Sequence, residues 1–237
     1  MNLKKEYSFS VIIPVLNESS RINQTIEHVF KTSSLSGFDV EVIVVDGDPG
    51  GKTVNSIRSD SVIKIISRKG RGAQMNRGAA VAHGDVLLFV HSDTMLPEDA
   101  LRAISSVMKE KTQVGGAFDL GIESDKLIFR IIEIGVYLRT RLTRIPYGDQ
   151  AIFIRKDFFR MIQGYREIPL MEDFELMRRI KKLGYRISII PQKVRTSPRR
   201  WEKKGVLYCT FTNWALRSLY LCGVHPEKLL KFYYKNW

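Results

Sequence analysis

The amino-acid sequence predicts an α/β fold, in which a parallel sheet carries helices on both of its faces. Near-continuous apolar runs at 10–16 and 40–46 are typical of strands that are buried on both faces. Segments with helical spacing of apolar residues lie between such runs, and this alternation of strands and helices is typical of a parallel sheet. With 237 residues, the chain is long enough for one large domain with a sizeable core.

The first half of the chain alternates strands and helices in strict order. We expect strands at 10–16, 40–46, 62–67 and 86–91. A first helix should follow the capping candidates Asn17 and Ser19, and a second should run from 71 to 83 and stop at Gly84. A third should open near Pro97. The apolar stripes of the first and third helices are Ile22, Ile26, Val29 and Phe30, and Leu101, Ile104, Val107 and Met108.

The second half has a different pattern, with short strands set between longer helical stretches. The expected elements are a strand at 116–122, a helix at 126–140, a strand at 151–155, a helix at 172–183 and a strand at 186–190. Gly184 supplies the stop for the second of these helices. Since no repeat or low-complexity linker separates the halves, we expect them to merge within one domain.

Composition restricts the partners and the compartment. The chain has 38 Lys and Arg against 25 Asp and Glu, a net charge of +13. Such a charge favours polyanionic partners, which include nucleic acid, phosphorylated ligands and an anionic membrane surface. Two cysteines, Cys209 and Cys222, form no disulfide framework, and the first apolar run is too short for a signal peptide. We therefore expect a cytoplasmic protein.

Chemically suggestive side chains follow the strands at their carboxyl ends, where open parallel sheets bind ligands. Asp46 ends the second strand and Asp93 follows the fourth, while a basic, glycine-containing turn at 68–72 follows the third. Carboxylates beside cations suit a ligand that is both hydroxylated and phosphorylated. Asp46 would bond a base or ribose, Asp93 a divalent metal, and Arg71 or Arg77 a phosphate.

Structural roles compete with each of these assignments. Asp93 is also compatible with capping a helix ahead of Pro97, and Asp46 with a turn before glycine. Convergence on one edge of one sheet favours the functional interpretation. Gly51, Lys52 and Thr53 resemble the end of a P-loop, but Asp46 stands where its first glycine belongs and would repel phosphate.

Several motifs together resemble a known family. They are SVIIPVLNE at 10–18, VVDG at 44–47, GRGAQMNRGAA at 70–80, GDVLLFVHSDT at 84–94, PYGDQ at 146–150, MED at 171–173 and SPRRWE at 197–202. In this order they resemble family 2 glycosyltransferases, in particular a bacterial subgroup of small, single-domain members. The resemblance implies the GT-A fold, a Rossmann-like nucleotide-binding sheet merged with a smaller acceptor-binding half.

The resemblance implies a nucleotide-sugar site at the strand ends. Asp46 corresponds to the aspartate that binds the nucleobase, and Pro14 and Glu18 line the same pocket. Asp93 is the last position of the D-x-D signature and would bind Mg²⁺ or Mn²⁺ that bridges the donor diphosphate. His91 stands where the first acidic residue usually stands, which leaves a sparse site for a hard cation. The remaining residues assigned to the nucleotide sugar are Arg71, Arg77 and Ser92.

The resemblance also implies catalytic and acceptor-binding residues. Asp173 matches the general base of an inverting transfer, and Glu172 lies beside it. The structural alternative is that a carboxylate opens a helix, where the helix dipole favours it. The residues assigned to the acceptor are Asp149, Gln150, Arg200 and Trp201.

The segment 206–224 is the most apolar part of the chain. Asn213 and Arg217 lie inside it, and a central arginine disfavours a membrane span. On a helix, Leu207, Phe211 and Trp214 share one stripe, next to a basic cluster at 199–204. Such a helix either lies on an anionic membrane at its inner face or packs on the domain, and packing is favoured.

These observations predict a single GT-A domain over 1–237, with a nucleotide-sugar-binding half at 1–93, an acceptor and catalytic half at 94–205 and an amphipathic helical segment at 206–237. The acceptor would be a glycan, a lipid-linked molecule or a small molecule with a free hydroxyl. A nucleic-acid-binding protein is the alternative from another class, but carboxylates at the binding edge would repel a phosphate backbone. A nucleotidyltransferase with the same sheet and metal is the second alternative.

Overall fold

The strands of the computed structural model, which describes residues 7–235, form one eight-stranded sheet in the order β3-β2-β1-β4-β7-β6-β8-β5. Its strands are β1 (Phe9–Val15), β2 (Val40–Asp46), β3 (Val62–Ile66), β4 (Val86–Phe89), β5 (Thr94–Met95), β6 (Gln113–Ile122), β7 (Phe153–Arg155) and β8 (Arg186–Thr196). The first four strands by sequence are parallel, as predicted. β7 runs antiparallel between β4 and β6, and β5 runs antiparallel to β8, so the whole sheet is mixed.

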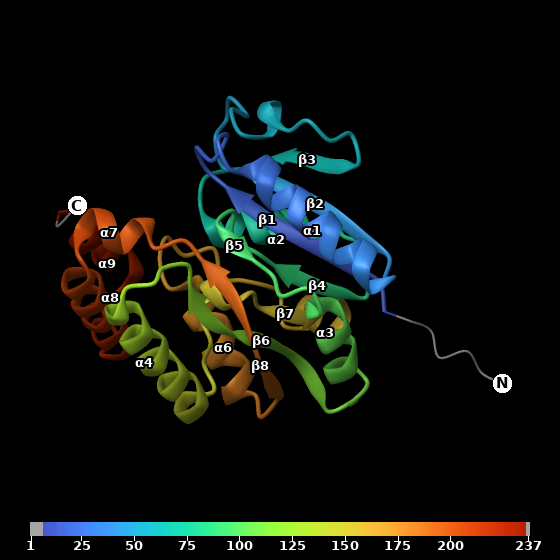
Figure 1. Ribbon diagram of the computed structural model, residues 1–237. Coiled ribbons are helices and arrows are strands. Elements are labelled where there is room, and N and C mark those ends of the chain that lie inside the picture. The colour runs from blue at the N-terminus through green and yellow to red at the C-terminus, as the bar shows by residue number, and fades with distance from the viewer. Residues whose placement is uncertain (1–6, 236–237) are drawn as a thin grey trace.

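Helices cover both faces of this sheet (Figure 1). They are α1 (Ile22–Ser36), α2 (Arg71–Val81), α3 (Ala100–Met108), α4 (Leu127–Thr143), α5 (Lys156–Met161), α6 (Glu172–Lys182), α7 (Arg199–Lys204), α8 (Val206–Leu221) and α9 (Pro226–Lys235), with two short 3-10 turns, η1 (Val54–Ser56) and η2 (Gly148–Gln150).

Alternation along the central strands divides the core into two layers. Val11 and Ile13 of β1 point into one apolar cluster with residues of α1, α3 and α4, whereas Ile12 points into the other with residues of α2, α5 and α6. Since successive side chains of a strand face opposite sides, a strand that is covered on both faces must be apolar throughout. This explains the near-continuous apolar runs.

Two predicted helix boundaries are wrong. Neither Asn17 nor Ser19 caps α1: the helix begins after Arg21 with no side-chain cap, and Asn17 adopts a left-handed conformation with φ of 59°. Gly84 does not end α2, which stops at Val81. Gly84 instead permits a close approach to β1, because a Cβ there would lie 2.6 Å from the carbonyl carbon of Phe9. β8 also continues to Thr196, six residues beyond its predicted end.

Helices α8 and α9 share a small apolar cluster with the segment just before α6, and its buried members are Leu170, Leu216 and Leu229. Figure 1 shows α7, α8 and α9 gathered with α4 on the left side of the view. No helix in residues 7–235 has the length and apolar character that crossing a membrane requires. Cys209 is buried in α8 and Cys222 is exposed, and both are free thiols.

Candidate active site

The carboxyl ends of β1, β2 and β4 bring the predicted site residues to one edge of the sheet. β1 lies between β2 and β4 in register, so Val15 is opposite Asp46 and Ile12 opposite Phe89. The segment after β4 carries His91, Ser92 and Asp93 past this edge. Parallel strands therefore place residues from three distant parts of the sequence together.

Asp46 is fully buried and organises the loop that follows β2. Its Oδ2 accepts hydrogen bonds from the backbone N–H groups of Thr53, at 2.8 Å, and Val54, at 3.1 Å, and its Oδ1 accepts one from Asp48 at 3.0 Å. These bonds engage both carboxylate oxygens. In this structure Asp46 fixes the loop after β2, and its contact with a nucleobase remains a prediction.

Gln74 of α2 joins the ends of two strands, a role that the sequence did not reveal. Its Nε2 donates hydrogen bonds to the carbonyl oxygens of Val15 and Val45, each at 2.8 Å, and the side chain is buried. The Val15 carbonyl also accepts a hydrogen bond from the Gly47 N–H at 2.9 Å, so Gln74 adds a second donor there. The only local signal is a polar residue on the buried side of an alanine-rich helix.

Arg199, at the start of α7, closes the same edge from the other end of the chain. Its guanidinium donates two hydrogen bonds to Glu18, at 3.1 and 2.7 Å, and its second terminal nitrogen lies 3.4 Å from Asp93 Oδ2. Asp93 does not cap α3, which begins seven residues later. Ser92 is buried, and its carbonyl oxygen accepts a hydrogen bond from Thr25. In the sequence Arg199 belongs to the basic cluster at 199–204. No sequence pattern identifies its partner Glu18, which lies 181 residues away.

Asp173 faces the segment after β4 across Gly148. Its Oδ2 accepts a hydrogen bond from the Gly148 N–H at 2.7 Å, and its Oδ1 accepts one from Phe174 N–H at 2.7 Å. A Cβ on Gly148 would lie 3.0 Å from His91 Nε2 and 3.4 Å from Asp173 Oδ2, so a side chain there would press tightly against both groups. Burial lowers the pKa of His91 to about 4, and Arg71 acts in the same direction. The imidazole is therefore neutral at physiological pH.

Glu172 is buried and forms an ion pair with Arg71, whose Nε lies 2.9 Å from Glu172 Oε1. This pair ties the start of α6 to the start of α2. Burial raises the pKa of Glu172, and the Arg71 guanidinium opposes that change. The structure therefore gives Glu172 a positioning contact, while Asp173, the next residue, faces Gly148 and His91.

The residues predicted to bind the acceptor separate into two groups. Asp149 lies near Asp173, and its Oδ1 is buried without a hydrogen-bond partner among the described residues. Gln150, by contrast, is buried within a network: its Oε1 accepts a hydrogen bond from Arg139 at 2.9 Å and its Nε2 donates one to the Phe118 carbonyl at 2.9 Å. Trp201 packs against the ring of Phe129 at 6.0 Å.

Cations surround the two aspartates. Burial raises the pKa of Asp149, whereas Arg139 and, more weakly, Arg200 and Arg71 lower it. Arg139 lies 3.5 Å from the centre of the Tyr147 ring, and Arg217 lies 5.9 Å from that of Phe174. Arg200 also donates a hydrogen bond to Asn213 at 3.2 Å. Arg77 is exposed farther along α2, and within residues 7–235 no ion pair joins it to this group.

The protein itself supplies few ligands for a metal ion. No cluster of three or more His, Cys, Asp or Glu side chains with the geometry of a metal site occurs in residues 7–235. Asp93 offers one carboxylate and His91 a neutral imidazole. Magnesium is usually held by one or two carboxylates together with substrate phosphates. These residues therefore fit a metal ion that a diphosphate helps to bind, and not one held by protein side chains alone.

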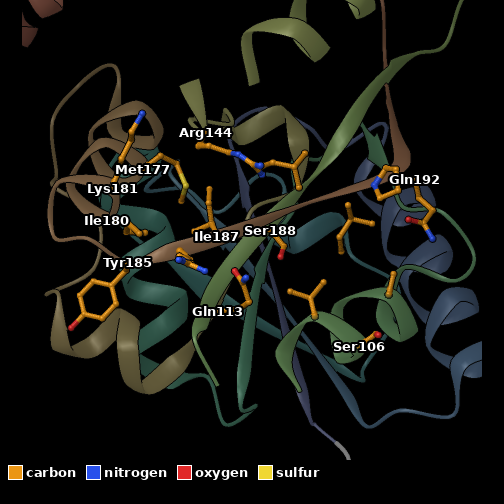
Figure 2. Close-up of a pocket in the computed structure, with 16 residues that line it drawn as sticks. Ser106, Gln113, Arg144, Met177, Ile180, Lys181, Tyr185, Ile187, Ser188 and Gln192 are labelled. Carbon is orange, nitrogen blue, oxygen red and sulfur yellow. The ribbon is translucent and has the colours of Figure 1, made fainter. Parts of the chain in front are cut away.

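A cavity of about 770 Å³ lies elsewhere, between α3, α6 and β8 (Figure 2). Figure 2 shows Lys181 and Tyr185 on one side of it and Ser106 and Gln192 on the other. None of the predicted site residues lines this cavity, and its lining includes no carboxylate. It therefore offers no carboxylate base, and the strand edge is the candidate active site.

Comparisons with known proteins show the family of the chain. The model of the family described as glycosyl transferase family 2 matches residues 10–220. The probable glycosyltransferase YdaM of Bacillus subtilis is 26% identical over 246 residues, which cover 93% of this chain and 57% of YdaM. The amylovoran biosynthesis glycosyltransferase AmsB of Erwinia amylovora is 25% identical over 79% of this chain and 68% of its own.

Solved structures share the fold. TarS of S. aureus, residues 1–349, superposes with a TM-score of 0.59 at 19% identity, over 81% of this chain and 61% of that chain. The mannosyltransferase PcManGT of Pyrobaculum calidifontis, in complex with GDP-Man and Mn²⁺, has a TM-score of 0.55 at 15% identity over 82% of this chain and 57% of its own. The predicted α/β fold is confirmed. The chain spans less than two thirds of the length of YdaM and TarS.

Proposed function

The chain belongs to glycosyl transferase family 2, and from this premise we propose that it moves a sugar from a nucleotide-diphosphate sugar to an acceptor hydroxyl, with inversion at the anomeric carbon. The observation that carries the proposal is the position of Asp173, which faces the segment after β4 across Gly148. A donor at the strand ends would have its diphosphate near Asp93 and its anomeric carbon toward Asp173. Family membership favours this reaction over nucleotidyl transfer.

Related structures support a donor of this class. TarS has been solved in complex with UDP-GlcNAc and PcManGT with GDP-Man. The two neighbours carry different nucleobases and sugars. We therefore assign this chain a nucleotide-sugar donor, without naming the base or the sugar.

Asp173 would act as the general base. As the acceptor oxygen attacks the anomeric carbon, its proton passes to an Asp173 carboxylate oxygen, and the bond to the diphosphate breaks with its electron pair on the leaving oxygen. Attack opposite the leaving group inverts the anomeric centre. The Gly148 N–H fixes the orientation of the carboxylate, and the Arg71–Glu172 pair holds the start of α6 in place. General-base catalysis of this kind is worth about 10²–10⁴-fold.

Asp93 and His91 are the residues that would hold Mg²⁺ or Mn²⁺ in this proposal. When bound, such an ion neutralises the charge that develops on the leaving diphosphate. Arg71 lies on the same side and would contact phosphate oxygens. The division into a nucleotide-sugar half at 1–93, an acceptor half at 94–205 and a helical segment at 206–237 is part of the same proposal.

A donor panel tests the proposal directly. UDP-, GDP-, CDP- and dTDP-sugars should be added one at a time to the full chain, with Mn²⁺ or with EDTA, while the melting temperature is followed. A ligand that binds only the native state raises this temperature. We expect one nucleotide class to do so, and more strongly with Mn²⁺. If free nucleotides, nucleotide sugars and buffer all give the same melting temperature, the proposed donor site is wrong.

A further inference from the structure

Helix α4 turns an apolar stripe toward solvent. Leu127, Ile131, Ile134, Leu138 and Leu142 are spaced at i, i+4, i+7, i+11 and i+15, and 53–82% of each side chain is exposed. At about 100° per residue, these positions share one side of the helix. The buried residues of α4 lie on the other side: Phe129, Glu133 and Thr140.

Helix α8 has a similar stripe. Leu207, Phe211, Trp214 and Leu221 are spaced at i, i+4, i+7 and i+14, and 46–69% of each side chain is exposed. Its buried residues, Cys209 and Leu216, lie elsewhere on the helix. A surface helix normally turns its apolar face to the core, and large exposed apolar patches mark sites of interaction. Helices α4 and α8 instead expose an apolar stripe to solvent.

The two helices lie at the same side of the molecule. Phe129 of α4 packs on Trp201 of α7, and Lys126, just before α4, pairs with Glu202 at 3.1 Å. α7 leads directly into α8, and Figure 1 shows all three helices together at the left of the view. The exposed stripes therefore belong to one region of the surface.

The charges around the stripes are mainly positive, although Glu123, Asp125 and Glu202 are also exposed there. The only acidic residue within α4 is Glu133, which is buried and paired with Arg130 at 2.9 Å and Lys193 at 2.8 Å. α8 contains no acidic residue. The exposed basic residues beside the two helices are Lys126, Arg130, Arg144, Arg200 and Lys203. Apolar and aromatic side chains bordered by Lys and Arg are the composition of helices that lie in the interface of an anionic membrane.

We propose that the outward faces of α4 and α8 dock on an anionic lipid bilayer, with both helices lying in its interface. A second copy of the chain fits this surface less well. A two-fold contact would bring its basic border against the same basic border, in a protein of net charge +13. Anionic lipids would instead complement that border, and the apolar side chains would enter the boundary between headgroups and acyl chains.

The docking face is separable from the catalytic residues. Arg139 of α4 contacts Tyr147 and Gln150, and Arg217 of α8 lies over Phe174. The residues of these helices that contact the catalytic region are therefore not those of the exposed stripes. Substitutions in the exposed stripes should therefore leave the site intact. The inference rests on the surface of the helices and does not depend on the proposed reaction.

Vesicle flotation of the full chain tests the proposal. Vesicles of phosphatidylcholine, with or without phosphatidylglycerol, should be compared at low and high salt. Two double variants remove the stripes, Ile131→Ser with Leu138→Ser and Phe211→Ser with Trp214→Ser. The matched control, Leu35→Ser with Leu183→Ser, removes two leucines that are 49% and 55% exposed elsewhere. Thermal melts check that all variants fold.

We expect the wild type to float with the anionic vesicles, and salt to weaken this binding through screening. Each stripe variant should bind at least about tenfold more weakly, since each loses two apolar side chains that would leave water. The control should bind like the wild type. Protein that stays at the bottom of the gradient overturns the proposal, as does equal binding by the stripe variants. A wild-type dimer that the stripe variants convert to monomers, without flotation, would assign the surface to a second copy instead.

Discussion

Two backbone N–H groups, from Gly148 and Phe174, hold the Asp173 carboxylate in one orientation. The first contact crosses from another segment of the chain and the second is local to the start of α6. Asp157, at the start of α5, makes the same local contact with Phe158 at 2.7 Å but is remote from the proposed site. Comparing substitutions of Asp173 and Asp157 therefore distinguishes a catalytic role from a role in starting a helix.

Asp173→Asn should lower turnover by about 10²–10⁴-fold, because the amide cannot accept the acceptor proton. Its oxygen can still accept the Gly148 N–H, so folding and donor affinity should hardly change. Single-turnover transfer and calorimetric nucleotide binding measure the two effects. Asp157→Asn is the control and should keep full turnover. An Asp173→Asn variant that unfolds early, while Asp157→Asn does not, would support a structural role, and unchanged turnover would exclude Asp173 as the base.

Nucleotide binding should depend on a divalent metal through Asp93. We expect Mn²⁺ to tighten binding of the donor nucleotide in the wild type and to have no such effect in Asp93→Ala, because the protein's one carboxylate at this position is gone. Calorimetry with Mn²⁺ and with EDTA measures the difference. Asp99→Ala, an exposed aspartate just before α3, is the control. Equal wild-type affinity with Mn²⁺ and with EDTA would contradict the metal role.

Asp149 should reduce stability at neutral pH. Burial raises its pKa above the ordinary value of 3.8, more than Arg139 lowers it. The folded state then binds a proton more readily than the unfolded chain, so stability falls as the pH rises through the raised pKa. Asp149→Asn should be more stable than the wild type at neutral pH, and the difference should vanish below the ordinary pKa. Melting temperatures across this range measure it; a less stable variant at neutral pH would show that the arginine contact outweighs burial.

At the scale of secondary-structure elements, the site depends on how α2 and α4 are attached to the sheet. α2 is attached through Gln74, which bonds the ends of β1 and β2, and through Gly78, where a Cβ would lie 2.6 Å from Ile12. α4 is attached through the buried Glu133, which accepts a hydrogen bond from Ile122 N–H at 2.7 Å and pairs with Lys193 of β8. In both helices, a polar side chain on the buried face provides the attachment.

Gln74→Met keeps the size of the side chain but removes the two hydrogen bonds to the carbonyl oxygens of Val15 and Val45. At about 0.5–1.5 kcal/mol for each hydrogen bond, the loss is about 1–3 kcal/mol. We expect the free energy of unfolding, measured in urea, to fall by this amount. Nucleotide affinity should also fall, and by more than in a variant with a surface substitution. Gln192→Met is the control, since Gln192 donates an exposed hydrogen bond to Asp99. Equal stability of the two variants would show that the strand ends find other donors.

At the scale of the whole molecule, Arg199 connects the C-terminal helices to two segments of the N-terminal half at the candidate site. It connects α7 to the segment after β1, through Glu18, and to the segment after β4, through Asp93. β6 and β8 extend the sheet beyond β7, and α7 follows β8 directly. The C-terminal helices, including the proposed membrane face, are therefore attached to the candidate site by this ion-paired arginine.

Arg199→Met should increase the affinity for Mn²⁺ in the absence of nucleotide. The substitution leaves Glu18 and Asp93 as neighbouring carboxylates without their shared cation, and two carboxylates attract a divalent ion more strongly than one. The melting temperature should then respond more to Mn²⁺ in the variant than in the wild type. Arg195→Met, an exposed arginine of β8, is the control. No gain in metal response would mean that the two carboxylates separate once the arginine is removed.

Much of the fold follows from local patterns in the sequence. Strands buried on both faces need near-continuous apolar runs, so the first four strands and their parallel order are readable in advance. Parallel strands align their carboxyl ends, and this alone predicts that residues 46 and 91–93 meet at one edge. The helices expected at 126–140 and 172–183 are found at 127–143 and 172–182, and a glycine stop, Gly184, was available only for the second. The sequence therefore determined the class of the fold and the edge of the sheet at which Asp46 and Asp93 meet.

Contacts between distant segments were decided only by the tertiary structure. Periodicity reports that α4 and α8 have apolar sides, but not that these sides face solvent, because that depends on which other surfaces are already buried. Likewise no local pattern pairs Arg199 with Glu18, aims Gln74 at two strand-end carbonyls, or inserts β7 antiparallel between β4 and β6. A side chain's partner depends on chain folding over tens to hundreds of residues, whereas spacing along the sequence constrains only its neighbours within a few turns.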